Sequence, residues 1–289
     1  MIVKELILIA IFIFSGYDAM AGLQDSAEGS IPVVFTSDSS KLAGRFFPAK
    51  GAGPFPTVIL LQGLPGGEGD IFGLGQRFSK EGINVFTFNY RGTWKSEGLW
   101  LPLTSLEDVK SSINFLKSPQ ITESLSIDTA QLSIVGYSYG GGMALLGSLF
   151  DPAIRKVVSI AGGDLNVVAG LIEKNPEFKK EHQQFMDNCM ADSNMVRGLG
   201  GKASHEWLLK NRYDYDIIKH AKELSNKTIF LIGGWRDQAI RVEDHILPLF
   251  RALQECGAKN LKIEVFDTDH SFEGYRDSLA DCIVDWIKQ

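Results

Sequence analysis

The chain has 289 residues, of which 44% are hydrophobic and 22% are charged, and its formal net charge is −6. This balance excludes an intrinsically disordered chain, which combines low hydrophobicity with high net charge. The acidic surface also excludes nucleic acid as a partner. Glycine is in excess, with 30 residues where an average usage of ~7% predicts about 20. Because no collagen-like repeat or Gly/Ser tract accounts for the excess, it indicates specific backbone positions that require glycine.

The N-terminus has the layout of a secretory signal peptide. Lys4 precedes an unbroken apolar run at residues 6–14, and a small-x-small cleavage site ends at Ala21. The run is too short to span a bilayer, which takes about 20 residues. We therefore expect a signal peptide over residues 1–21, a secreted or periplasmic protein, and no stable membrane span after cleavage. The alternative is an uncleaved anchor or a buried first strand.

The rest of the chain alternates short apolar strands with amphipathic helices, the pattern of βαβ units around a mostly parallel sheet. Continuous apolar runs such as TVILLQ at residues 57–62 predict strands covered on both faces. An apolar stripe at helical spacing predicts a helix with Thr104 and Glu107 as its capping box. In chain order, we expect strands at 31–36, 42–48, 57–62, 83–89, 131–135, 155–161, 228–233 and 261–266, the first two paired antiparallel, and helices at 70–80, 106–116, 139–150, 242–256 and 271–288.

The alternation breaks between residues 165 and 226, where the sequence is polar and helix-prone and contains no convincing strand. An interruption of about 60 residues is too long for a connecting loop. We interpret it as a helical cap inserted into a single α/β domain over residues 22–289. Its apolar group predicts either an acyl or aromatic pocket or, as we favour, simple packing of the cap onto the core. The group consists of Phe185, Met186, Cys189, Met190 and Met195.

The sequence Gly136-Tyr137-Ser138-Tyr139-Gly140 is a G-x-S-x-G motif between a predicted strand and a predicted helix. The chain must turn from strand to helix within one residue, so we expect Ser138 in a strained conformation between glycines that avoid collisions. The N-terminus of the helix favours negative charge that develops beside it. A phosphate-binding loop is disfavoured because neither G-x-G-x-x-G nor G-x-x-x-x-G-K-[ST] fits. We therefore predict that Ser138 is a nucleophile.

A serine hydroxyl needs a base and an orienting acid, which are expected in the order Ser, acid, His. Asp237 follows the strand at 228–233, and His270 follows the last strand. Both lie beyond the carboxyl ends of strands, at the edge that carries the nucleophile. Asp164 is the alternative acid, and His245 is expected to be a surface or structural residue inside a helix.

The oxyanion hole needs two preorganised backbone N–H groups. We expect one from Tyr139, directly after the nucleophile, and one from Leu64 in the glycine-rich loop after residues 57–62. Because no CxxC motif or His/Cys cluster occurs, no metal and no cofactor are expected. Of the three cysteines, Cys256 and Cys282 either pair in a disulfide or are small core residues.

With these motifs the chain resembles the α/β-hydrolases that act through a serine, nearest to the dienelactone-hydrolase and prolyl-oligopeptidase-like branch. Residues 89–92 (NYRG) resemble the D-Y-R-G turn of that family, and residues 267–272 match D-x-D-H-x-F. The resemblance implies the α/β-hydrolase fold and the triad Ser138–Asp237–His270. The chain departs from the family at Gln62, where histidine is frequent, and the changed side chain alters the hydrogen bonding behind the oxyanion loop.

These observations predict a secreted serine hydrolase that cleaves a small-molecule ester or peptide-like substrate through an acyl-enzyme intermediate. The alternative is a serine peptidase or amidase of the prolyl-oligopeptidase-like type, for which Glu68 is a candidate carboxylate to recognise a free N-terminus. A non-catalytic binding protein on the same fold is disfavoured because all three triad residue types are present.

Overall fold

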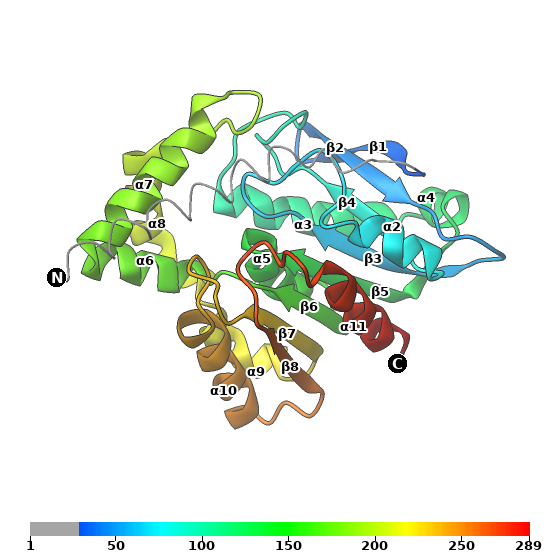
Figure 1. Ribbon diagram of the computed structural model, residues 1–289. Helices are drawn as coiled ribbons and strands as arrows, with labels where there is room; N and C mark the ends of the chain where they lie inside the picture. Colours follow the sequence, from blue (N-terminus) through cyan, green and yellow to red (C-terminus); the bar gives the residue numbers. More distant parts are fainter. Residues whose placement is uncertain (1–28) are drawn as a thin grey trace.

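The computed structural model describes residues 29–289, so the signal peptide predicted at residues 1–21 lies outside the described residues. The strands are β1 (Ile31–Ser37), β2 (Ser40–Phe47), β3 (Phe55–Leu61), β4 (Asn84–Phe88), β5 (Ile127–Tyr137), β6 (Lys156–Ile160), β7 (Thr228–Gly234) and β8 (Leu261–Phe266). They form one sheet in the order β1-β2-β4-β3-β5-β6-β7-β8 (Figure 1). β2 pairs antiparallel with β1 and with β4, and the other neighbours are parallel, which confirms the mostly parallel sheet.

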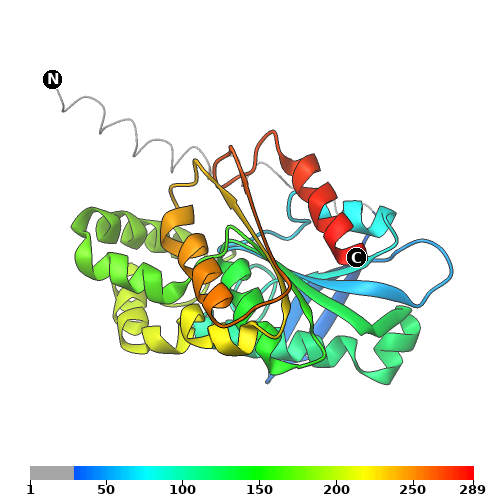
Figure 2. The same cartoon turned by 90° about the horizontal axis from the view of Figure 1, so that it is seen from below.

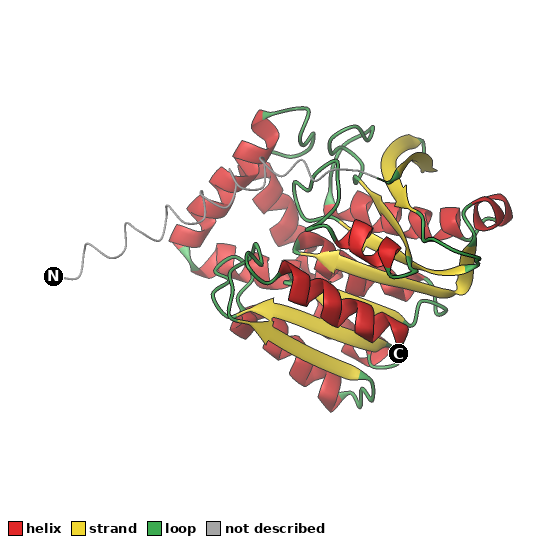
Figure 3. Cartoon of the chain, turned by 45° about the vertical axis from the view of Figure 1, so that its right-hand side comes forward, coloured by secondary structure: helices red, strands yellow, loops and turns green. Residues whose placement is uncertain are grey.

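Helices cover both faces of the sheet (Figure 3). On one face, α2 (Leu74–Lys80) and α11 (Arg276–Lys288) share an apolar cluster with the strands. On the other face, α3 (Pro102–Leu116), α5 (Tyr139–Gly147) and α10 (Leu247–Glu255) share a second cluster. The short helices α4 (Pro119–Ser124) and η1 (Ser148–Phe150) follow α3 and α5 in the chain.

The apolar run of β3 is buried on both sides, as its composition predicts. Val58 and Leu60 pack in the cluster of α2 and α11. Ile59 and Leu61 pack in the cluster of α3 and α5, and all four side chains are fully buried. Because successive side chains of a strand point to opposite faces, a sheet covered on both faces requires such a continuous run. Burial of each side chain stabilises the fold by roughly 1.5–3 kcal/mol.

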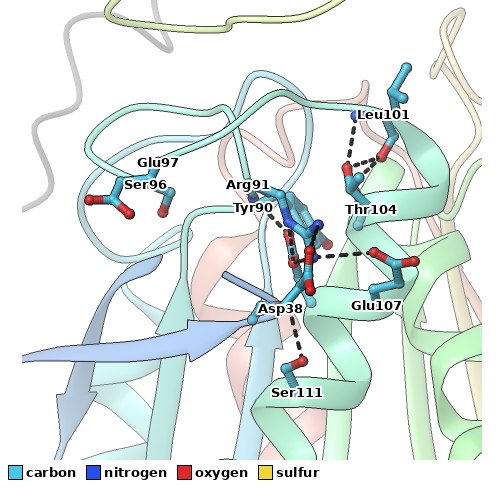
Figure 4. Close-up of polar contacts among 12 residues, drawn as sticks. Asp38, Tyr90, Arg91, Ser96, Glu97, Leu101, Thr104, Glu107 and Ser111 are labelled. Carbon is cyan, nitrogen blue, oxygen red and sulfur yellow. Dashed lines mark hydrogen bonds and ion pairs between the residues drawn. The ribbon is translucent and has the colours of Figure 1, made fainter. Parts of the chain in front are cut away.

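α3 begins at Pro102, before the predicted start, so the predicted capping box of Thr104 with Glu107 is wrong. Leu101 is the N-cap, and its backbone N–H donates to the Thr104 hydroxyl at 3.0 Å (Figure 4). Proline suits the first helical position because an N–H there would have no partner and its φ is already helical. Thr104 is therefore the third residue of the helix, and Glu107 lies 3.3 Å from the Arg91 guanidinium instead.

Three other predicted helices begin differently. α2 begins late because the Asp70 carboxylate accepts the Gly75 N–H at 2.6 Å and keeps the preceding residues in turns. α11 begins only after turns at residues 271–275. The helix before β8 starts as the π-helix η4 (Val242–Ile246) and continues as α10, because Pro248 has no N–H to donate to the preceding turn.

A buried ion pair ties the loop after β4 to α3. Asp108 accepts hydrogen bonds from the Arg91 backbone N–H at 2.7 Å and from its guanidinium at 2.9 and 3.2 Å. Arg91 also donates to the Ser37 hydroxyl of β1, so one guanidinium joins three elements. The Asp108 side chain has no exposed surface, and only 8% of the Arg91 side chain is exposed.

We expect Asp108→Ala to lower the free energy of unfolding by about 3 kcal/mol, because the buried Arg91 guanidinium loses its buried carboxylate. It then keeps only the exposed carboxylates of Asp38 and Glu107. Urea denaturation followed by tryptophan fluorescence measures the change. Glu206→Ala is the control: it removes the acid of the exposed Lys202–Glu206 pair and should leave the free energy of unfolding nearly unchanged. Equal effects of the two variants would show that the buried pair does not stabilise the fold.

The segment predicted as a cap, residues 165–226, lies between β6 and β7 and contributes no strand to the described sheet. Its helices α6, α7 and α8 stand together beside one end of the sheet (Figures 1 and 2). That the segment is an insertion into one domain stays a prediction. Its helices are α6 (Leu165–Lys174), α7 (Pro176–Ala191), α8 (Gly201–Asn211), η2 (Arg212–Tyr215), η3 (Ile217–His220) and α9 (Ala221–Leu224).

Main-chain contacts fasten the connection between α7 and α8 to the loop after β4. Thr93 forms an antiparallel bridge with Val196, and Trp100 forms a parallel bridge with Gly198. The Arg197 guanidinium donates to two backbone carbonyls of the same loop. The cap is therefore held to the sheet half of the chain by backbone as well as side-chain contacts.

Two further expectations concern cysteines and membranes. Cys256 and Cys282 form no disulfide, and both are half-buried. Within residues 29–289, none of the helices combines the length and apolarity needed to cross a bilayer.

Candidate active site

Ser138 occupies the single residue between β5 and α5, with φ of 56° and ψ of −121°. Such a conformation costs about 1–3 kcal/mol and persists only where the surroundings enforce it. A Cβ on Gly136 would lie 2.0 Å from the Gly140 carbonyl oxygen. A Cβ on Gly140 would lie 2.4 Å from the carbonyl oxygens of Leu61 and Gln62. The two motif glycines therefore permit the close packing of α5 against β5 and β3 that lifts Ser138 above the sheet.

The structure brings the three predicted catalytic side chains together. His270 Nε2 lies 2.9 Å from Ser138 Oγ, and His270 Nδ1 lies 2.7 Å from Asp237 Oδ2. The other carboxylate oxygen of Asp237 accepts the N–H groups of Ala239 and Ile240, both at 2.8 Å. Because the buried carboxylate can only accept, Nδ1 carries the imidazole proton, and Nε2 is left to accept the proton of the serine hydroxyl.

The three side chains differ in their exposure to solvent. The Asp237 side chain is fully buried, whereas 25% of the His270 side chain is exposed. Ser138 is half-buried. A substrate can thus approach the hydroxyl while the carboxylate stays screened from water.

The loop after β3 approaches the nucleophile as expected. A Cβ added to Gly63 would lie 3.4 Å from Ser138 Cβ, so the backbone before Leu64 passes beside the serine. Tyr139 is the first residue of α5, a position whose N–H has no acceptor within the helix. That Leu64 and Tyr139 form an oxyanion hole stays a prediction. Gln62, where the family often has histidine, donates to the Gly69 carbonyl at 3.2 Å and so joins the two ends of the loop.

Asp164, the alternative acid, lies outside the Ser138–His270–Asp237 chain of hydrogen bonds. Its Oδ1 accepts the N–H groups of Asn166 and Val167 at the start of α6, and its Oδ2 accepts the Ile217 N–H at 3.0 Å. One buried carboxylate thus fastens the chain where it enters the cap and near where it leaves. Burial raises the pKa of Asp164 to about 6. The backbone N–H of Asp164 donates to His245 Nδ1 at 3.1 Å, which makes that buried histidine structural and not a surface residue.

We expect the neutral imidazole of His245 to make stability depend on pH. Burial lowers the pKa of His245 to about 4, whereas an unfolded histidine titrates near ~6.5. Since the unfolded chain then binds the proton more readily, this stabilisation is complete above about pH 6.5 and is lost as the pH falls towards about 4. Urea denaturation of wild type and His245→Gln measures it, because the amide accepts the same hydrogen bond without titrating.

The difference in unfolding free energy between the two proteins should shrink from pH 7 to pH 4.5. Asp164 is present in both, so its own titration cancels in the difference. A difference that stays constant over this range would show that His245 has the same pKa in the folded and the unfolded protein.

The apolar group of the cap packs onto the core, as favoured. Met186 and Cys189 are each 2% exposed and belong to the main apolar cluster. The half-buried remainder of the group, Phe185, Met190 and Met195, packs against the same cluster, as does Leu64 of the loop after β3. Within the described part of the chain, no three His, Cys, Asp or Glu side chains gather in a group suited to a metal ion.

One residue of the site was missed by sequence reasoning. The Tyr137 hydroxyl donates to the backbone carbonyl of His270 at 2.8 Å. Its position within the G-x-S-x-G motif was visible in the sequence, but its partner lies in a loop more than a hundred residues away.

Comparisons with known proteins agree on one fold. A family model described as the alpha/beta hydrolase fold matches residues 56–199. The uncharacterised protein YfhR of Salmonella typhimurium is 24% identical over 265 residues, which cover 89% of this chain and 80% of that protein. An esterase of Pyrococcus furiosus superposes with a TM-score of 0.67 at 18% identity, covering 90% of each chain. An acylaminoacyl peptidase of Pyrococcus horikoshii gives 0.66 at 17% identity, covering 90% of this chain and 42% of the peptidase.

Proposed function

The chain has the α/β-hydrolase fold that its motifs predict, and we propose that it is a serine hydrolase that cleaves carboxylic esters. The observation that carries the proposal is the unbroken chain of hydrogen bonds from Asp237 through His270 to Ser138. This arrangement supplies a nucleophile, a base and an orienting acid in the geometry that acyl transfer requires.

In the proposed first step, the Ser138 oxygen attacks the ester carbonyl while His270 Nε2 takes the hydroxyl proton. Asp237 holds the other imidazole proton and stabilises the positive charge that forms on His270. The N–H groups of Leu64 and Tyr139 donate to the oxyanion, and the loss of one such donor raises the barrier by about 3 kcal/mol. The carbon–oxygen bond to the alcohol then breaks, and His270 gives its proton to the leaving alkoxide.

In the second step, water replaces the alcohol. His270 Nε2 accepts a proton from water as its oxygen attacks the acyl-enzyme carbonyl. Collapse of the second tetrahedral intermediate breaks the bond to Ser138 Oγ, which recovers its proton from His270. The carboxylic acid leaves and the free enzyme is restored.

The fold does not choose between esters and amides, since an esterase and an acylaminoacyl peptidase both share it. Serine peptidase or amidase activity is therefore the second candidate. We favour the ester over a peptidase that recognises a free N-terminus, because such recognition requires a carboxylate at the site. Glu68, the candidate for that role, lies 3.1 Å from the Lys95 ammonium, and both side chains are exposed.

A substrate panel tests the proposal. We expect p-nitrophenyl esters of short and medium acyl chains to be hydrolysed with far higher kcat/KM than aminoacyl or prolyl p-nitroanilides. Faster hydrolysis of the anilides would favour the peptidase. Absence of hydrolysis, together with no labelling of Ser138 by a fluorophosphonate in the folded protein, would favour a binding protein on the same fold.

We also propose that the protein is exported, on the strength of the signal-peptide pattern at residues 1–21. N-terminal sequencing of protein recovered outside the cytoplasm should begin at Gly22. A chain that begins at Met1 in that fraction would contradict cleavage after Ala21.

A further inference from the structure

Tyr137 connects the strand that carries the nucleophile to the loop that carries the base. Its hydroxyl donates to the His270 carbonyl at 2.8 Å, and its ring centre lies 5.0 Å from the imidazole at an angle of 34°. Tyr137 is the last residue of β5, directly before Ser138, and is 2% exposed. Tyr137 therefore contacts His270 through its side chain and is joined to Ser138 through its backbone.

The ring of Tyr137 is itself firmly packed. Phe72 meets it edge-on with centroids 4.7 Å apart, and Phe72 has a φ of +54°, which aromatic residues rarely adopt. The Arg276 guanidinium lies 4.7 Å from the centre of the Phe72 ring, and Phe272 packs against Phe72 at 6.3 Å. Packed in this way, Tyr137 has little room to change rotamer, so its hydroxyl is a fixed anchor.

The Tyr137 hydroxyl donates to the backbone carbonyl of His270, the residue that is the proposed base. The neighbouring carbonyls of the loop have other donors: the Arg236 N–H bonds the Thr268 oxygen at 2.9 Å, and Arg276 Nε bonds the Ser271 oxygen at 3.2 Å. Burial raises the pKa of Tyr137 well above its ordinary value, so the hydroxyl remains a proton donor wherever the enzyme is folded. Packing alone would be served equally well by phenylalanine, which has the same ring.

We propose that Tyr137 is a positioning residue whose hydroxyl sets the height and orientation of His270 over Ser138. The inference rests on the proposed triad and adds a side chain that acts only through His270, whose backbone carbonyl it binds and whose ring it packs against. A displacement of about 1 Å in a catalytic group can cost about 100-fold in rate. Loss of one of several anchors of the His270 loop is therefore expected to cost about 10-fold in kcat.

Tyr137→Phe tests the proposal, with Tyr90→Phe as its matched control. Tyr90 is also buried, and within the described residues its hydroxyl has no hydrogen-bond partner, so removing it should leave the kinetics at wild-type values. For Tyr137→Phe we expect kcat on a p-nitrophenyl ester to fall about 10-fold with KM unchanged. Labelling of Ser138 by a fluorophosphonate should slow by a similar factor but still reach completion.

The pH dependence of kcat/KM distinguishes a positioning role of the Tyr137 hydroxyl from a purely structural role. A looser bond between His270 and Asp237 favours the imidazolium less, so the apparent pKa in the kcat/KM profile of Tyr137→Phe should fall. If this variant keeps the wild-type kcat, labelling rate and pH profile, the inference about Tyr137 is overturned and the proposed function is not affected. A lower kcat with an unshifted profile, a raised KM and reduced thermal stability would also overturn it, because those changes indicate a structural role. If wild type is not labelled at all, the proposed function fails and this inference with it.

Discussion

Ser138→Ala is expected to abolish ester hydrolysis, lowering kcat by about 10⁶-fold. Alanine cannot form the acyl-enzyme, and the hydroxyl that His270 contacts at 2.9 Å is lost. The fold should persist, since alanine carries the same Cβ and meets the same positive φ as serine at this turn. The removal of one half-buried hydrogen bond costs only about 1 kcal/mol. Hydrolysis of a p-nitrophenyl ester measures the loss, and circular dichroism verifies the fold.

Ser225→Ala is the control for this variant. The Ser225 hydroxyl donates to the Lys222 carbonyl at the end of α9, so its removal should not affect turnover. A residual rate some 10³- to 10⁴-fold above that in water is expected in Ser138→Ala from the remaining binding and oxyanion contacts. Wild-type turnover in Ser138→Ala would mean that the nucleophile lies elsewhere.

The positions of the central strands could be predicted because these strands consist mostly of consecutive apolar residues. β3, β4 and β7 lie within about two residues of the predicted positions, since burial on both faces makes most of their residues apolar. Helix starts were less predictable because they depend on local hydrogen bonds. Pro102 begins α3 early, and the Asp70 carboxylate delays α2, and neither effect follows from apolar periodicity.

The candidate triad was predictable for a topological reason. Parallel strands present their carboxyl ends at one edge, so residues that follow β5, β7 and β8 must converge there whatever their separation in the chain. The motif around Ser138 then selected which serine, and the order of acid and histidine selected Asp237 and His270.

Roles that depend on a single distant contact were not predictable. Asp164 follows β6 at the same edge and has the same chemistry as Asp237, yet its partners are amides of the cap, and Ile217 is 53 residues away. The signal that distinguishes it is its place immediately before α6, where an aspartate acts as an N-cap. His245 was equally ambiguous, because helical periodicity does not reveal which histidine of a helix faces a buried amide.

Asp237→Asn should give the second large effect, a fall in kcat of about 10⁴-fold at neutral pH. The structure fixes how asparagine would sit. The N–H groups of Ala239 and Ile240 both point at Oδ1, so the amide oxygen must occupy that place. The amide NH₂ then faces His270 Nδ1, which can no longer donate and becomes the acceptor. The imidazole proton moves to Nε2, opposite Ser138, and the base is lost while the packing is preserved.

Asp267→Asn is the matched control for this change. Asp267 belongs to the loop that carries His270 and pairs with Arg236, but its side chain is 73% exposed, so the same loss of charge should leave kcat near the wild-type value. Steady-state kinetics at pH 7 measures both variants, and denaturation in urea verifies that both are folded. Because both oxygens of Asp164 already accept backbone N–H groups of the cap, we expect no replacement of Asp237 by Asp164. Near-wild-type turnover in Asp237→Asn would therefore contradict both the acid assignment and the tautomer on which the proposed mechanism depends.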